Sequence, residues 1–222
     1  MRVFAPLALL LLPALVMAQE FRVPTVDDSR KNKWDFSFNF VAQDSETSDG
    51  SNGSSLKLNS DVGWGFGIHY NMHKNFSLGF DYSYIKPRYT ATYVKDDGEI
   101  GTISHEASFS TGLLKGTWYM LDNDLTPYAD LGLGWTYADS NVSSGPPTTG
   151  CWWDPWWGYI CAPYWSTYSD TSFSYGGGLG VRWNITPAFF LKGSYNLQKV
   201  DLSSLAGDPT LNAWKFELGG SF

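Results

Sequence analysis

The sequence predicts an all-β protein, a closed eight-stranded antiparallel transmembrane β-barrel. Three observations carry this prediction. Eight segments alternate apolar and polar residues with a period of two, the spacing of a strand whose two faces differ. Aromatic residues, 17% of the chain, gather on the apolar faces, and glycine, serine and ionisable residues share the opposite faces. Short and long connections alternate strictly between the segments, as inner turns and outer loops do in membrane barrels.

Residues 1–18 have the features of a secretory signal peptide. The run 3–16 is almost entirely apolar, and small or apolar side chains precede the expected cleavage site. A retained anchor is disfavoured, because the run is shorter than the roughly 18–20 apolar residues of a spanning helix and Pro6 and Pro13 interrupt it. We therefore expect cleavage after residue 18 and a mature barrel domain, 19–222, in the bacterial outer membrane.

The clearest strand is predicted at 61–72, where even positions such as Trp64 are apolar and odd positions are small or polar. The other alternating segments are 34–40, 76–84, 114–120, 129–137, 173–183, 189–198 and 214–222. The fourth segment along the chain is the least regular, since Leu113 and Leu121 break its pattern. A soluble sandwich fills its apolar faces with aliphatic residues. The aromatic faces here instead favour an exterior in lipid and a polar interior.

The connections fit a barrel with both termini in the periplasm. The three short connections are 73–75, 122–126 and 184–187. The four long, polar connections lie near 43–60, 86–104, 139–170 and 199–209. We expect the short ones to be periplasmic turns and the long ones to be external loops.

The chain ends on an aromatic residue, Phe222, on the apolar face of the last segment. A terminal aromatic in this position resembles the signal that the barrel-assembly machinery reads. Four further aromatic residues stand beside the short turns, where a girdle at the inner membrane interface is expected. They are Trp118, Tyr128, Trp183 and Phe189.

Several of these segments resemble the outer membrane protein W family. The similar stretches are 67–72 (GIHYNM), 75–78 (NFSL), 84–87 (YIKP) and 126–135 (TPYADLGLGW), with the closing Phe222. The resemblance covers most of the barrel but not its loops. It implies an eight-stranded barrel with a narrow, partly hydrophobic channel, proposed to pass small apolar molecules. The third long connection and a more charged interior depart from that pattern.

The inward face of the predicted barrel collects ionisable side chains of both signs. They are Asp35, His69, Asp81, Lys115, Asp130, Arg182, Lys192, Lys215 and Glu217. An eight-stranded barrel is just wide enough for its own side chains to fill it. Buried charges need partners, so the pattern favours a salt-bridge network that plugs the lumen. A selective pore is the alternative.

The third long connection holds the two cysteines of the chain, Cys151 and Cys161, which can pair in an oxidising periplasm. A metal site is disfavoured, because only two thiols and no adjacent histidine are present. The segment also holds an unusual density of aromatic residues, typical of an interaction site. The candidate interaction residues are Trp152, Trp153, Trp156, Trp157 and Tyr159. A cap over the barrel mouth, or a contact with the outer leaflet, is the alternative.

One alternative function is enzymatic, since some small outer-membrane barrels modify lipid A with a histidine, a serine and an acid. Ser104, His105 and Glu106 are the candidates at the outer side. Neighbouring residues on a strand point to opposite faces, so these three residues are poorly placed to act together. The sequence therefore favours a protein that is not an enzyme.

The net charge of −7 and the lack of a basic stripe exclude nucleic acid as a partner. We expect a monomer without cofactor or metal, surrounded by outer-membrane lipid and lipopolysaccharide. The function that the sequence favours is a narrow channel or binding protein for small, apolar molecules. The alternative is a closed structural or adhesive surface barrel with a tryptophan-rich external loop.

Overall fold

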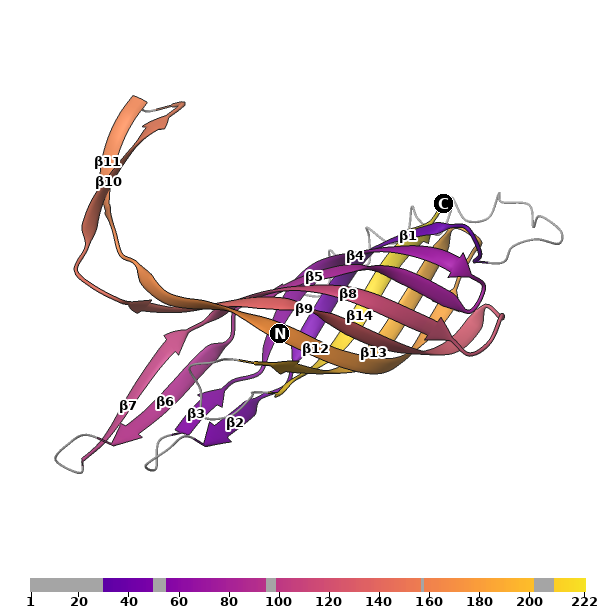
Figure 1. Cartoon of the computed structure of the whole chain (residues 1–222), viewed down its shortest axis with the longest axis horizontal. Coiled ribbons are helices and arrows are strands. Elements are labelled where there is room, and N and C mark those ends of the chain that lie inside the picture. The colour runs from indigo at the N-terminus through magenta and orange to yellow at the C-terminus, as the bar shows by residue number, and fades with distance from the viewer. Residues whose placement is uncertain (1–29, 50–54, 95–98, 157, 202–209) are drawn as a thin grey trace, which may run out of the picture.

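The computed structural model describes residues 30–49, 55–94, 99–156, 158–201 and 210–222. Its barrel strands are β1 (Trp34–Gln43), β4 (Asp61–His73), β5 (Phe76–Ile85), β8 (Ser108–Tyr119), β9 (Leu125–Ser143), β12 (Thr167–Asn184), β13 (Phe189–Val200) and β14 (Thr210–Ser221). The predicted fold is confirmed: these eight strands close into an antiparallel barrel in the order β1-β14-β13-β12-β9-β8-β5-β4 (Figure 1). None of the described residues forms a helix long and apolar enough to cross a membrane. The expected signal peptide, 1–18, lies outside the described residues.

The barrel closes where its first strand meets its last. β1 pairs with β14, with Asp35 opposite Ser221, and on its other side it pairs with β4. The backbone N–H of Trp34 donates to the carbonyl oxygen of Phe222 at 2.7 Å, and the reciprocal bond is 2.9 Å long. Each barrel strand therefore has two hydrogen-bonded neighbours, which satisfies its backbone in hydrocarbon.

The two faces of the strands alternate as predicted. Along β1, Phe36 and Phe38 are about half exposed, whereas Ser37 and Asn39 are buried. The same alternation runs through the other barrel strands, so aromatic and aliphatic side chains cover the outside and polar ones fill the inside. This is the arrangement of a barrel whose exterior faces lipid.

Three of the four residues expected in the girdle beside the short turns have the outward direction that the prediction requires. Trp118, Trp183 and Phe189 are on the outer face and more than half exposed. Tyr128 is only 2% exposed and lies in the lumen, so its placement in the girdle is wrong. Tyr128 is two residues before the inward Asp130 on the same strand, and period-two alternation therefore turns it inward.

Glycines let neighbouring strands curve closely around this narrow barrel. A Cβ atom at Gly134 of β9 would lie 1.9 Å from the carbonyl oxygen of Gly112 on β8. At Gly65 of β4 it would lie 2.1 Å from the carbonyl oxygen of Tyr82 on β5. No larger residue fits either position without moving the backbone, which explains the glycine-rich inward faces.

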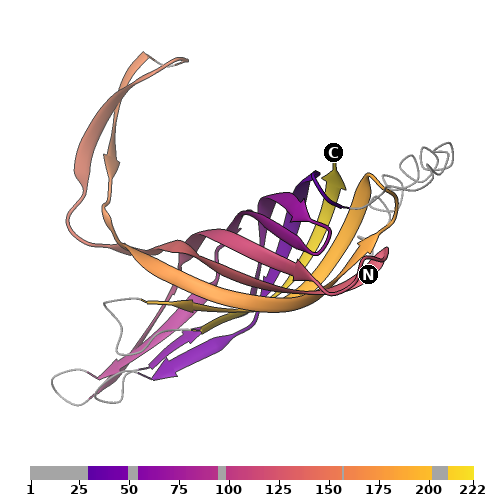
Figure 2. The ribbon, with the colours of Figure 1, turned by 45° about the vertical axis from the view of Figure 1, so that its right-hand side comes forward.

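The first two long connections, predicted as loops, contain strands. β2 (Glu46–Asp49), β3 (Ser55–Leu58), β6 (Arg88–Val94) and β7 (Ile100–Glu106) form a separate sheet in the order β2-β3-β6-β7. Figures 1 and 2 show this sheet beyond one end of the barrel, opposite the end that carries the C-terminus. β6 is rich in tyrosine, threonine and valine, residues that favour strands.

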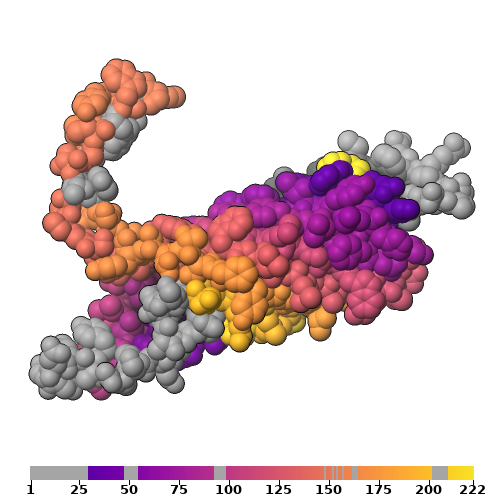
Figure 3. Space-filling view, in the orientation of Figure 1, coloured from indigo at the N-terminus to yellow at the C-terminus, as the bar shows by residue number. Residues whose placement is uncertain are grey.

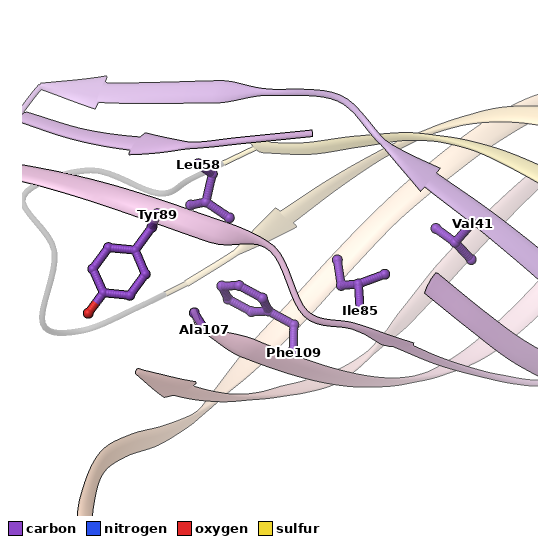
Figure 4. Close-up of a cluster of buried hydrophobic side chains, with 6 residues drawn as sticks. All are labelled: Val41, Leu58, Ile85, Tyr89, Ala107 and Phe109. Carbon is purple, nitrogen blue, oxygen red and sulfur yellow. The ribbon is translucent and has the colours of Figure 1, made fainter. Parts of the chain in front are cut away.

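A buried apolar cluster joins this external sheet to the outer end of the lumen (Figure 4). Val41, Ile85 and Phe109 come from the barrel strands β1, β5 and β8. Leu58 and Tyr89 come from the external strands β3 and β6, and Ala107 also belongs to the cluster. Burying these side chains requires the external sheet, which explains why polar-looking connections fold into strands.

The third long connection forms a hairpin of β10 (Thr148–Asp154) and β11 (Gly158–Tyr164), which pair only with each other. In Figures 1 and 2 the hairpin turns aside from the long axis of the barrel at its outer end. The space-filling view in Figure 3 shows it as an arm standing clear of the barrel wall. The hairpin does not cover the barrel mouth.

Candidate functional site

Asp81, on β5, is the centre of an ion-pair network in the lumen. Its carboxylate lies 2.6 Å from Lys215 Nζ and 3.4 Å from Lys115 Nζ. His69 Nε2 lies 3.0 Å from the other carboxylate oxygen. All four side chains are buried. One carboxylate therefore joins strands β4, β8 and β14 through their inward side chains.

The network continues along the lumen in two directions. Lys115 Nζ donates to Asp130 Oδ2 at 3.0 Å and to Asn196 Oδ1 at 3.3 Å. Lys215 Nζ lies 3.2 Å from Glu217 Oε1, and Lys192 Nζ lies 3.8 Å from the second oxygen of Glu217. Seven of the nine ionisable residues singled out in the sequence thus form one connected group.

The remaining two, Arg182 and Asp35, form a second buried pair nearer the short turns. The two terminal guanidinium nitrogens of Arg182, Nη1 and Nη2, donate to the Asp35 carboxylate. Arg182 also donates to Tyr119 Oη at 3.1 Å and to Ser221 Oγ at 3.2 Å. Ser221 Oγ in turn donates to Asp35 at 2.5 Å. The carboxylate is therefore surrounded by donors, as a buried charge requires.

Two aromatic rings link the two charged groups. The Arg182 guanidinium lies 4.0 Å from the centre of the Phe190 ring, and Lys192 Nζ lies 5.1 Å from it. Both cations also lie within 6 Å of the Tyr119 ring centre. Phe190 did not emerge from the sequence as a lumen residue. Its signal was present, because it follows the outward Phe189 and must point inward.

Arg30, before β1, lies among the short turns at one end of the barrel and also escaped the sequence prediction. It is 6% exposed, and its guanidinium donates to the backbone carbonyls of Lys74, Leu121 and Asn123 at 2.7–3.3 Å. It lies 4.7 Å from the centre of the Tyr119 ring. Arg30 stands outside every alternating segment, so no periodicity could have assigned it a direction.

Arg30→Ala is expected to lower the free energy of unfolding by about 1–3 kcal/mol, because it removes charge-assisted bonds to carbonyls of two turns. Urea unfolding of the refolded barrel in lipid vesicles measures the change. Lys31→Ala is the matched control, since Lys31 is exposed and its loss should cost less than about 0.5 kcal/mol. Equal effects of the two substitutions would show that Arg30 does not hold the turns.

A polar pocket of about 500 Å³ lies beyond the closed part of the barrel, where β6 and β7 meet β9. Glu106 lies 3.1 Å from Lys86 Nζ and 3.5 Å from Arg88 Nε. The hydrogen bond and charge of Lys86 lower the pKa of Glu106, and Glu106 raises the pKa of Lys86 in return. Every one of these groups is at least 40% exposed, so the pocket is an open surface feature.

The pocket contains the three candidates for enzymatic chemistry, without a catalytic arrangement. Ser104 Oγ donates its hydroxyl proton to the carbonyl oxygen of Tyr89 at 3.2 Å and not to His105. His105 pairs across the strands with Tyr89, and the two rings lie 6.3 Å apart. Ser104 and Glu106 share the other face of β7, as period two dictates. Among the described residues, no three histidine, cysteine or acidic side chains gather in a possible metal site.

A disulfide joins Cys151 of β10 to Cys161 of β11, the pair singled out in the sequence. Two residues from the disulfide toward the tip of the hairpin, Trp153 stands opposite Tyr159, and both side chains are about 70% exposed. Trp156, at the tip, is 84% exposed. Of the other two candidates, Trp152 is placed on β10 opposite Ile160, and Trp157 lies outside the described residues.

Replacing both cysteines by serine, Cys151→Ser with Cys161→Ser, should loosen the hairpin and leave the barrel intact. The bridge closes a short loop and contributes about 2–3 kcal/mol of loop-closure entropy to the hairpin alone. Chymotrypsin should therefore cut the variant faster within 148–164, with no change in the unfolding midpoint of the barrel. A lower barrel midpoint would show that the hairpin supports the barrel.

Comparison with known protein families shows the family to which this chain belongs. The family described as outer membrane protein beta-barrel domain matches residues 5–222. The chain belongs to this family. Its place among the small eight-stranded outer-membrane barrels is thereby confirmed, and a bacterial outer-membrane location follows. No curated protein sequence matches it significantly.

Several solved structures of outer-membrane proteins are similar to this chain. Neisserial surface protein A is 13% identical, with a TM-score of 0.52, over 86% of this chain and 96% of that one. Ail, the attachment invasion locus protein of Yersinia pestis, is 17% identical over 86% of this chain and 99% of its own, with a TM-score of 0.48. OprG from Pseudomonas aeruginosa is 14% identical over 86% and 96%, with a TM-score of 0.49. At 13% identity, the likeness to Neisserial surface protein A concerns the fold alone.

Proposed function

We propose that this family member is a non-enzymatic, monomeric surface-binding barrel whose lumen is closed by its own ion pairs. The observation that carries the proposal is the set of charge pairs that cross the lumen. Asp81 and Lys215 come from β5 and β14, which are separated by two strands in the barrel order. Asp35 and Arg182 come from β1 and β12, which are also separated by two strands.

These pairs block the path that a solute would take. Passage requires Lys215 and Arg182 to leave their carboxylates in a space without bulk water, where an unpaired charge is costly. The apolar cluster lies at the outer end of the lumen, and Arg30 narrows the inner end, where a cavity of about 200 Å³ lies between it and Arg182. Three successive layers of side chains therefore support a closed barrel.

The binding role is assigned to the external strands. The four-stranded sheet and the β10–β11 hairpin extend the fold well beyond the barrel (Figure 1). A closed barrel then serves as the membrane anchor of a surface structure surrounded by lipid and lipopolysaccharide. Phe222, exposed at the end of the last strand, is the residue through which the barrel-assembly machinery would recognise the chain.

The alternative function is a narrow channel for small apolar molecules, as the resemblance to the outer membrane protein W family implies. It requires the Asp81 and Asp35 pairs to separate during passage. A simple permeability measurement tests whether the lumen is closed to small polar solutes. Vesicles that contain the closed barrel should swell in isotonic arabinose no faster than vesicles of lipid alone. Faster swelling that depends on the amount of folded protein would reject the closed lumen.

A further inference from the structure

The third external segment is almost devoid of charge. Between residues 140 and 169 the only acidic or basic residue is Asp154, although the chain as a whole carries a net charge of −7. Ion pairing with a charged protein surface is therefore a poor account of its exposed aromatic residues. Tryptophan and tyrosine without charges are typical of segments that sit at the interface between lipid and water.

The hairpin presents its aromatic residues in a fixed arrangement. Trp153 and Tyr159 stand opposite each other on neighbouring strands, so their side chains share one face of the hairpin. The Cys151–Cys161 bridge lies on the same face, two residues away. With Trp156 at the tip, the hairpin carries a stapled aromatic end, which we call the aromatic tip: Trp153, Trp156 and Tyr159.

The rest of the chain shows what this protein does with exposed tryptophan. Outside the third external segment, each exposed tryptophan in the described part of the chain lies on the outer wall of the barrel. These residues are Trp34, Trp64, Trp118, Trp135, Trp183 and Trp214. That wall faces lipid, so lipid is the environment in which this sequence otherwise exposes tryptophan.

The direction in which the hairpin leaves the barrel determines which membrane surface it can reach. The end of the barrel that carries the β2-β3-β6-β7 sheet is the outer end, because the short turns are at the other end. From this end the hairpin turns sideways, away from the barrel axis and the mouth (Figures 1 and 2). A segment running sideways there lies above the leaflet that surrounds the barrel.

We propose that the aromatic tip docks on the outer leaflet of the membrane in which the barrel itself is embedded. Trp153, Trp156 and Tyr159 would enter the interface between head groups and acyl chains, with the disulfide holding the hairpin in shape. This contact goes beyond the closed-barrel function and does not depend on whether the lumen conducts. It makes the hairpin a second, lateral attachment of the protein to its membrane.

Fluorine NMR of the full mature protein in phosphatidylcholine nanodiscs tests this contact. The protein carries 5-fluorotryptophan, and Trp153→Phe, Trp156→Phe and Trp135→Phe variants assign three resonances. A phospholipid with a nitroxide near its head group is then included in the disc. The Trp153 and Trp156 resonances should be lost together with that of Trp135, which faces lipid on the barrel wall. They should persist when a water-soluble paramagnetic chelate replaces the labelled lipid.

Two results would overturn the proposal. Retention of the Trp153 and Trp156 resonances while the Trp135 resonance is lost would place the tip away from its own leaflet. Loss only when the nitroxide is carried by separately added vesicles would make the partner an opposing membrane. Loss of the Trp135 resonance in the labelled disc shows in each of these samples that the barrel is folded in its lipid. In the labelled disc, the Cys151→Ser/Cys161→Ser variant should show stronger Trp153 and Trp156 resonances than the disulfide-bonded protein. Its Trp135 resonance should still be lost.

Discussion

Asp81→Asn is expected to lower the free energy of unfolding of the barrel by about 3–5 kcal/mol, the cost of breaking a buried ion pair from one side. Asparagine keeps the size of the side chain and removes its charge. Lys115 and Lys215 would then share the lumen without the carboxylate that lies 3.4 Å and 2.6 Å from them. Denaturant titration in lipid vesicles, followed by tryptophan fluorescence, measures the loss.

Glu106→Gln is the matched control for this prediction. Glu106 also joins two cations, Lys86 and Arg88, but all three are at least 40% exposed and beyond the closed part of the barrel. Water screens this pair, so its loss should cost no more than about 1 kcal/mol. Similar losses for Asp81→Asn and Glu106→Gln would show that the lumen is hydrated and that its charges do not depend on one another.

Arg182→Met should lower stability by a similar amount, about 3–5 kcal/mol, because it leaves the Asp35 carboxylate buried without its cation. The double variant with Asp35→Asn removes both charges together. Its loss should fall short of the sum of the two single losses by about 1–3 kcal/mol, the coupling of groups in direct contact. The same unfolding titration on the four proteins of the cycle gives this coupling.

Additive losses in that cycle would contradict the account. They would mean that Arg182 acts through its contacts with Tyr119 and Phe190 rather than through the Asp35 carboxylate. Arg182→Lys separates the two roles, since lysine keeps the charge but cannot donate to both carboxylate oxygens in parallel. We expect Arg182→Lys to lose less stability than Arg182→Met.

The strand pattern of this barrel could be predicted from sequence because one rule governs it. Each strand separates lipid from a polar lumen, so alternation alone assigns the direction of nearly every side chain. The misplaced Tyr128 obeys the same rule, since it has the parity of Asp130. Its expected place in the girdle was wrong because the period of two along β9, and not the nearby turn, sets its direction.

The contacts outside the alternating segments could not be predicted in this way. Arg30 binds carbonyls of two turns that are more than 40 residues away, and no local pattern encodes such a contact. The external sheet depends on apolar residues scattered over separate connections, among them Leu58 and Tyr89. Their burial becomes apparent only when the barrel brings those connections together.

Single-channel conductance of the refolded mature protein in a planar bilayer tests whether the lumen is closed. The measurement is made first with the Cys151–Cys161 bridge oxidised and then after its reduction. If the ion pairs and the apolar cluster close the lumen as we propose, the folded barrel should show no discrete conductance steps in either state. Reproducible steps from the folded protein would contradict the closed lumen, and steps that change on reduction would make the hairpin part of a gate.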